Sequence, residues 1–415
     1  MIIYEFKKKI GFFTLMMLLI LQPFHFIVGE FFPYYRELAA LIFFLLFLEE
    51  VNKKLYSDII RPEVKYLLLS LIYLCLISLF DSGKSLYGND VLLASVYLNR
   101  INPTVYILRN SFLYIPMVLY FGIRGIDKRE VIKIAIACSV VAPFSVLEFL
   151  RKNLMMGIKD LGLLVELGGA GLFYNTYVPY LTFPFVSSLF LCCQLKKMKI
   201  LFIGISMFLF FYIFSTTSRQ SFLFLILSML LFYVYIPLKN KIKLNFLLVV
   251  LILVGSNFFL FALDGYHISD KLLNRYSGAD TFLETSRIQK IFYGLKLLSF
   301  HEFFWGAGVS SVVVSGPHND FIRWLQRIGC LGMLLSFSPF LISMKNILKK
   351  NIIYEMDEIY IKLYIFLSLF YTLYHSCFGY PREDAYQSLY SFLGLTLWLG
   401  YSRKGKSDSV GCIRY

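Results

Sequence analysis

The chain has 415 residues, of which 58% are hydrophobic and 18% aromatic, and its mean hydropathy is +0.67. This composition excludes an ordinary water-soluble domain and indicates a protein that lies in a membrane. The net charge of +15 is spread over the loops between apolar runs and forms no continuous basic patch, which argues against a nucleic-acid partner. The seven cysteines show neither a metal-ligand spacing nor a disulfide framework.

Apolar runs long enough to cross a bilayer recur along the whole chain. They predict an all-α polytopic integral membrane protein that forms a single domain over residues 1–415. We expect about twelve transmembrane helices, at residues 10–28, 34–48, 64–80, 104–123, 130–149, 174–194, 200–215, 220–237, 244–263, 318–343, 358–377 and 384–401.

Clusters of Lys and Arg follow a regular pattern in the predicted connections. If the N-terminus lies in the cytoplasm, every second connection is basic and all of these connections fall on the cytoplasmic side, as the positive-inside rule requires. The C-terminus is then cytoplasmic as well. The clusters lie at residues 7–9, 53–65, 124–129, 196–199, 239–243, 345–350 and 403–414.

The longest polar segment, residues 264–317, is predicted to form a large loop on the side away from the cytoplasm. Thr281 and Glu284 have the spacing of a capping box at the start of a helix. Apolar residues then recur at helical spacing, which predicts an amphipathic helix at about 282–299 that lies on the membrane or on the other helices.

Three residues on the outer side have the chemistry of a diphosphate site. Arg219 opens the eighth predicted span, Arg287 begins the loop helix, and His318, followed by Asn319, opens the tenth span. A guanidinium group matches phosphate oxygens in two-point contact, a helix N-terminus favours anions, and histidine transfers protons near neutral pH. The alternatives are an interfacial anchor for Arg219, a solvated helix face for Arg287 and a helix-start residue for His318.

Further charged residues are secondary candidates. Arg109 falls inside the fourth span, where a charge is costly unless it faces the protein interior, and Arg36 and Glu37 could pair with it or with each other. Arg382 and Asp384 belong to an external turn that could simply cap the last span. No metal-ligand motif, phosphate-binding loop or sugar-nucleotide motif is present, so we expect no metal and no cofactor.

Glycines follow the histidine at a fixed spacing. Pro317 suits the first position of a helix, and on an ideal helix Gly329 would lie below His318 on one face, about 16 Å away, with Gly332 close to the same stripe. These glycines are predicted to let another helix or a lipid chain approach closely.

His318-Asn319, nine residues, Gly329, two residues and Gly332 together resemble a motif of the bacterial O-antigen ligase and O-antigen polymerase (Wzy-type) superfamily. Arg219 and Arg287 resemble the two arginines of that family. The preceding Gly306-Ala-Gly308, the number of spans and the large external loop are also similar. The resemblance covers the architecture of the whole chain, but specific motifs only between about 216 and 332.

The resemblance implies a metal-independent, GT-C-like membrane glycosyltransferase of the bacterial inner membrane. Its donor would be an oligosaccharide on undecaprenyl diphosphate, used at the periplasmic face among membrane lipids. Arg219 and Arg287 would hold the diphosphate, Asn319 would help to bind substrate, and His318 would act as the general base or bind the acceptor. A chain-length regulator protein is a candidate partner.

Several functions remain open at this stage. A polymerase joins lipid-linked repeat units to one another, whereas a ligase transfers the finished glycan to lipid A–core, and we favour the polymerase. A polysaccharide flippase or transporter would also have about twelve spans, but should show charges and broken helices at mid-membrane and repeat symmetry. A purely structural protein would tolerate the loss of Arg219, Arg287 and His318.

Overall fold

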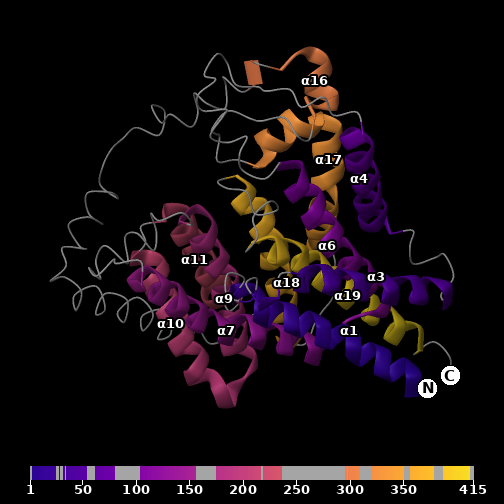
Figure 1. The fold of residues 1–415 in the computed structure, drawn as a ribbon. Helices are drawn as coiled ribbons and strands as arrows, with labels where there is room; N and C mark the ends of the chain where they lie inside the picture. Colours follow the sequence, from indigo (N-terminus) through magenta and orange to yellow (C-terminus); the bar gives the residue numbers. More distant parts are fainter. Residues whose placement is uncertain are drawn as a thin grey trace.

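The structure, a computed structural model, describes residues 2–24, 28, 31–32, 34–53, 61–79, 103–155, 174–215, 218–235, 295–296, 298–308, 320–349, 356–377 and 387–411. Within this part of the chain every regular element is a helix, which confirms the all-α class (Figure 1). The predicted span at 244–263 and most of the predicted loop helix at 282–299 lie outside the described residues.

The long helices overlap the apolar runs that predict them, but their bounds differ in places: the first helix begins eight residues before the predicted span 10–28, and the last helix ends ten residues after the predicted span 384–401. The ninth of the twelve predicted ranges is outside the described part, and each of the others overlaps one helix. These helices are α1 (Ile2–Leu21), α3 (Tyr35–Lys53), α4 (Pro62–Leu79), α6 (Pro103–Arg124), α7 (Lys128–Met155), α9 (Tyr174–Gln194), α10 (Lys199–Ser215), α11 (Arg219–Leu230), α17 (Asp320–Lys349), α18 (Met356–Ser376) and α19 (Gln387–Gly411).

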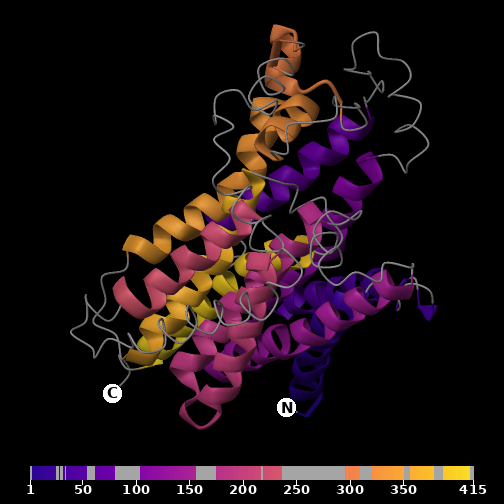
Figure 2. The same cartoon turned by 90° about the vertical axis from the view of Figure 1, so that its left-hand side faces the viewer.

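Shorter elements join or extend the long helices. The 3-10 turns η1 (Gln22–Phe24) and η3 (Lys196–Met198) follow α1 and precede α10, and the π-helical segment η4 (Leu231–Tyr235) extends α11. A six-residue helix, α16 (Phe300–Trp305), precedes α17. It lies at the opposite end of the molecule from the start of α1 and the end of α19 (Figures 1 and 2).

Among the described residues, four segments are long and apolar enough to cross a membrane. They are Pro62–Leu79, Lys128–Glu148, Lys196–Phe214 and Phe321–Lys349, and the apolar helices Val178–Gln194 and Gln220–Val234 are shorter. Between 28% and 50% of the residues in each of the four are buried in the protein, so much of their apolar surface faces outward. An outward apolar surface on a spanning helix is expected where lipid surrounds it.

Polar contacts at one end of the bundle join helix starts to helix ends. Lys7 of α1 pairs with Glu49 near the end of α3. Glu63 at the start of α4 accepts hydrogen bonds from Asn346 of α17 at 2.8 Å and from the indole of Trp398 in α19 at 3.3 Å. Because most of the predicted cytoplasmic lysines and arginines in the described residues also belong here, we call this the basic end.

At the opposite end of the bundle, hydrogen bonds also join the end of one helix to the start of the next. Tyr35 at the start of α3 donates a hydrogen bond to Gln22, just after α1, at 3.1 Å. Thr372 near the end of α18 donates to the carbonyl oxygen of Ser391 in the second turn of α19 at 3.1 Å. Successive long helices therefore alternate in direction from α1 to α11 and again from α17 to α19. We call this end, where α3, α6, α9, α11, α17 and α19 begin, the outer end.

The helix that follows the histidine motif differs from the predicted one. Gly329 has φ 68° and ψ 179°, so α17 is interrupted there and is not one continuous ideal helix. The prediction that Gly332 continues the helical face of Gly329 was therefore wrong, because it assumed unbroken helical geometry. His318, from which that face was counted, lies outside the described residues. The interruption divides α17 into a short outer part, Asp320–Ile328, and a longer part that reaches the basic end.

Candidate functional site

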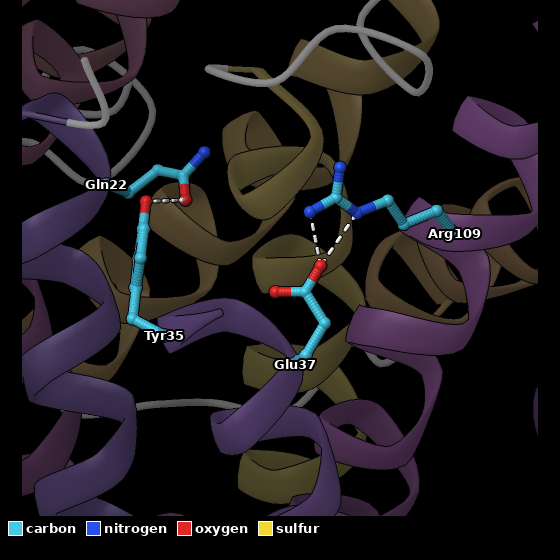
Figure 3. A network of polar contacts seen from close by, with 4 residues as sticks. All are labelled: Gln22, Tyr35, Glu37 and Arg109. Carbon is cyan, nitrogen blue, oxygen red and sulfur yellow. Dashed lines mark hydrogen bonds and ion pairs between the residues drawn. The ribbon is translucent and has the colours of Figure 1, made fainter. Parts of the chain in front are cut away.

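The outer end contains an ion pair between two helices. Arg109 of α6 contacts Glu37 of α3 through both Nε and Nη2, with the Nε···Oε1 distance at 2.8 Å (Figure 3). The two side chains are 34% and 35% exposed. The sequence predicted that Arg109 needs a polar partner and offered Arg36 and Glu37 as candidates. In the structure the partner is Glu37.

Buried polar groups surround this pair. Tyr35 projects from α3 toward Gln22, and Glu37 projects from the same helix toward Arg109 (Figure 3). Gln22 and Arg36 are 1% and 4% exposed. Arg36 interacts electrostatically with Tyr114, Tyr35 and Glu37. A guanidinium group is costly to bury unless charges or dipoles compensate it. The outer end therefore contains two arginines, Arg36 and Arg109, whose charges are balanced by Glu37 and by nearby polar groups.

The start of α11, where Arg219 is the first residue, is attached to the end of α18. The hydroxyl of Tyr374 donates a hydrogen bond to the carbonyl oxygen of Gln220 at 2.8 Å. Ser218, which precedes the helix, donates to the hydroxyl of Ser221 at 3.0 Å. The side chain of Arg219 is outside the described part of the chain, but its backbone has a defined place at the outer end.

His375 lies beside this attachment and packs in the core. Its ring contacts Phe224, Tyr371 and Tyr374, and the residue is 1% exposed. Its Nε2 lies 3.0 Å from the hydroxyl oxygen of Thr182, which donates its own proton to the carbonyl oxygen of Pro179. Nε2 must therefore carry the proton and donate it to Thr182. His375 is therefore a packing residue of the core.

The motif glycines form one structural unit at the break in α17. The backbone N–H groups of Ala307 and Gly308 donate hydrogen bonds to the carbonyl oxygens of Gln326 and Arg327, at 2.8 and 3.0 Å. These carbonyls end the outer part of α17 and would otherwise lack a helical partner at the interruption. The segment after α16 thus replaces the hydrogen bonds that the break in α17 removes.

Close backbone contact explains why this unit needs glycine. A Cβ atom on Gly329 would overlap the backbone of Phe304 and Gly306, and a Cβ on Gly306 would overlap the backbone of Arg327 and Ile328. Both glycines also have positive φ, at 68° and 90°, which side chains disfavour. The prediction that Gly329 permits a close approach is confirmed, and the approaching group is the α16 segment of the same chain.

Gly332 permits a second approach, by a side chain of α4. A Cβ atom on Gly332 would meet the ring of Tyr73. The Tyr73 hydroxyl lies 3.0 Å from the carbonyl oxygen of Ile328 and 3.1 Å from that of Trp305. Tyr73 thus joins α4, α16 and the outer part of α17 at one point.

Most of the predicted site residues lie outside the described part of the chain. These are His318, Asn319, Arg287, Arg382 and Asp384. Described α17 begins at Asp320, directly after the His318-Asn319 pair, at the outer end where Arg109 and Arg219 also lie. Convergence of Arg219, Arg287 and His318 on one cavity stays a prediction.

The sequence interpretation also missed some contacts that shape this end. Ser299 and Glu302 form a complete capping box at the start of α16, and their Ser-X-X-Glu spacing was readable from the sequence. The contacts of Tyr374 with Gln220 and of Tyr73 with Trp305 join residues 154 and 232 positions apart, and no local pattern announces them.

Comparison with known proteins identifies no relative. Neither a family model, nor a curated protein, nor a solved structure matches the chain. In the part of the chain that the structure describes, the fold is that of an all-helical protein with helices suited to a membrane.

Proposed function

We propose that this protein is an O-antigen polymerase, a membrane glycosyltransferase that joins undecaprenyl-diphosphate-linked oligosaccharide repeat units. In this proposal about twelve helices cross the bacterial inner membrane, both termini are cytoplasmic, and residues 264–317 form a periplasmic loop. The outer end then faces the periplasm, where lipid-linked repeat units would meet.

The observation that carries the proposal is the interlocked glycine unit. Gly306, Gly308, Gly329 and Gly332 of the motif have specific structural roles at the outer end of α17. A motif that was only a chance match would not be expected to place all of its glycines at one closely packed junction. This junction holds the helix that starts directly after His318 and Asn319.

The chemistry follows from the residue types. The acceptor hydroxyl oxygen of one repeat unit would attack the anomeric carbon of another, and the bond from that carbon to the diphosphate oxygen would break. The leaving diphosphate gains negative charge, which Arg219 and Arg287 would stabilise. His318 would take the proton of the acceptor hydroxyl, and Asn319 would orient the substrate. The energy comes from the glycosyl diphosphate bond, so the step uses no metal or nucleotide.

A deletion strain separates the polymerase from its main alternative, the ligase. Lipopolysaccharide from the strain is run on a gel, with the wild-type gene as the complementing control. Loss of a polymerase leaves a core that carries one repeat unit, because ligation continues. Loss of a ligase leaves a bare core, and long glycan accumulates on the lipid carrier. An unchanged ladder would contradict both functions.

Variants then test the residues. We expect His318→Ala, Arg219→Ala and Arg287→Ala each to reduce the long-chain ladder strongly while the protein still inserts into the membrane. Arg151→Ala is the matched control, because Arg151 also lies at the end of a helix but its side chain is 52% exposed and pairs with Glu148. Full complementation by His318→Ala would remove the histidine from the mechanism.

The flippase alternative has a separate readout. A flippase variant would stop lipid-linked repeat units from reaching the outer leaflet, whereas a polymerase variant would let single units accumulate there. The ion-paired Arg109 is the described charge that most favours a transport pathway, and its place at the outer end, beside Glu37, fits a fixed helix contact better than a charge at mid-membrane.

A further inference from the structure

Helix α16 exposes a group of aromatic side chains. Phe300, Phe303 and Phe304 are spaced at i, i+3 and i+4, so they share one face, and they are 83%, 40% and 44% exposed. Trp305, at the end of the helix, is 50% exposed. We call these four residues the α16 aromatic face. Such a face normally packs onto a core in water, and here it points away from the protein.

The chain holds this face outward by several contacts. The capping box of Ser299 and Glu302 fixes the start of α16, and the Ala307 hydrogen bond to Gln326 attaches its end to α17. The rings of Phe300 and Phe304 also contact each other, with centroids 5.1 Å apart. The outward orientation is therefore a property of a well-anchored element.

The position of Trp305 relative to α4 follows from one contact. The hydroxyl of Tyr73 reaches the carbonyl oxygen of Trp305 at 3.1 Å. Tyr73 lies six residues before Leu79, where α4 ends, which corresponds to about 9 Å along the helix axis. Since Pro62–Leu79 is suited to cross a membrane, the backbone of Trp305 lies within reach of a side chain from the last two turns of a spanning segment.

The two helices that contact α16 also expose apolar side chains. Leu69, Ile72 and Leu76 of α4 are 48%, 55% and 50% exposed. Below the break, Leu331 and Leu334 of α17 are 39% and 54% exposed. Both helices are suited to cross a membrane, so acyl chains are the occupant expected against these leucines.

The polar neighbours of the face fit the boundary of a bilayer. Lys296, four residues before α16, and His301 within it are exposed, and Glu302 of the same helix is taken up by the capping box with Ser299. Aromatic residues concentrate where acyl chains meet head groups, and lysine reaches from there to phosphate and water. An apolar face with a basic rim is the usual pattern of a helix that lies in this interface.

We infer that the α16 aromatic face is inserted into the interfacial layer of the lipid bilayer at the outer end of the molecule. Phospholipids, rather than a second protein, cover Phe300, Phe303, Phe304 and Trp305. Inserted in this way, α16 would hold the outer part of α17 at a fixed depth. The inference does not depend on the proposed glycosyltransferase activity.

Tryptophan fluorescence can test this, because the chain contains three tryptophans and the other two, Trp324 and Trp398, are 2% and 5% exposed. The full chain is reconstituted into phosphatidylcholine–phosphatidylglycerol vesicles that carry bromine either near the head or near the end of the acyl chain. The signal of Trp305 is taken as the difference between the native chain and Trp305→Phe. A second preparation, Trp324→Phe with Trp398→Phe, isolates Trp305 directly.

We expect brominated lipid to quench Trp305, more strongly when bromine is near the head group, and aqueous iodide to quench it weakly. Strong quenching by iodide without quenching by lipid would overturn the inference, because the face would then contact water. Protection from both quenchers would also overturn it, because protein would cover the face. If the double variant fails to fold, the difference measurement on the native chain still decides.

Discussion

At the scale of single residues, Gly329 has the most demanding environment in the described part of α17. Its positive φ and the backbone of Phe304 and Gly306 leave no room for a side chain. We expect Gly329→Ala to lower the free energy of unfolding by about 1–3 kcal/mol or more, from backbone strain and overlap together. Thermal unfolding of the purified protein in detergent measures this as a lower Tm.

Gly204 of α10 provides the matched control. A Cβ atom there would meet nothing within 4 Å, and the residue sits inside a regular helix. Gly204→Ala should be neutral or stabilise the protein by up to about 1 kcal/mol, because alanine is the better helix former. Equal effects at both positions would contradict the structural role of Gly329.

The ion pair of Arg109 with Glu37 makes a second prediction at this scale. Each side chain is about one third exposed, so we expect a coupling free energy of about 1 kcal/mol in a double-mutant cycle with Arg109→Gln and Glu37→Gln. Each single variant removes the Arg109–Glu37 contact, although Arg36 still interacts with Glu37 in Arg109→Gln. The double variant should therefore be less destabilised than the sum of the two single variants. The exposed pair Arg151–Glu148 is the control, with a smaller coupling. A coupling near zero at Arg109–Glu37 would mean that the contact adds nothing to stability.

At the scale of elements, the attachment of α18 to the start of α11 links packing to the proposed activity. Tyr374→Phe removes the hydroxyl that donates to the Gln220 carbonyl oxygen and should cost about 1 kcal/mol of stability. If Arg219 binds diphosphate, the looser start of α11 should also shorten the lipopolysaccharide ladder while the protein level in the membrane stays the same. The gel and an immunoblot of the same cells report both quantities.

Tyr66→Phe is the control for Tyr374→Phe. Tyr66 lies in α4, away from the contact between α18 and α11, and its side chain is 37% exposed. The variant loses the same hydroxyl and should leave the ladder intact. An intact ladder in Tyr374→Phe would show that Tyr374 is not needed to position Arg219. A shorter ladder with less protein in the membrane would be explained by a folding defect alone.

At the scale of the whole molecule, the helix directions group residues into two ends, and the proposed topology assigns the outer end to the periplasmic side. Cys377 follows α18 at the outer end and is exposed, and residue 197 lies in the η3 turn at the basic end. In a chain whose other cysteines are replaced by alanine, a membrane-impermeant thiol reagent should label Cys377 in intact spheroplasts. A cysteine introduced as Lys197→Cys, in place of Cys377, should react only after permeabilisation. Labelling of both residues from the same side would contradict the arrangement of the two ends.

The success of the helix predictions has a local cause. The range 174–194 predicted for one span coincides with α9, and 200–215 differs from α10 by one residue at its start. Where an apolar run is flanked by polar residues, these residues mark the ends of the helix in the sequence itself. The capping box of Ser299 and Glu302 was equally local and could have been found, although the sequence interpretation instead emphasised Thr281 and Glu284, which lie outside the described residues.

The interruption of α17 could not be predicted in this way. Gly329 and Gly332 within an apolar run are compatible with a continuous membrane helix, and nothing near them in sequence indicates positive φ. The break is stabilised by Ala307 and Gly308, whose N–H groups reach the carbonyls of Gln326 and Arg327. Such compensation becomes visible only when segments about 20 residues apart are placed together.

The sequence by itself determined the helical class, the positions of the long helices and the clustering of positive charge, because hydrophobic runs and charges act over a few neighbouring residues. Only the tertiary structure decided that Arg109 pairs with Glu37, that Tyr374 anchors the start of α11, and that α16 turns its aromatic face outward. Each of these three features depends on how the helices pack against one another. Helix packing is decided by contacts between residues far apart in the chain.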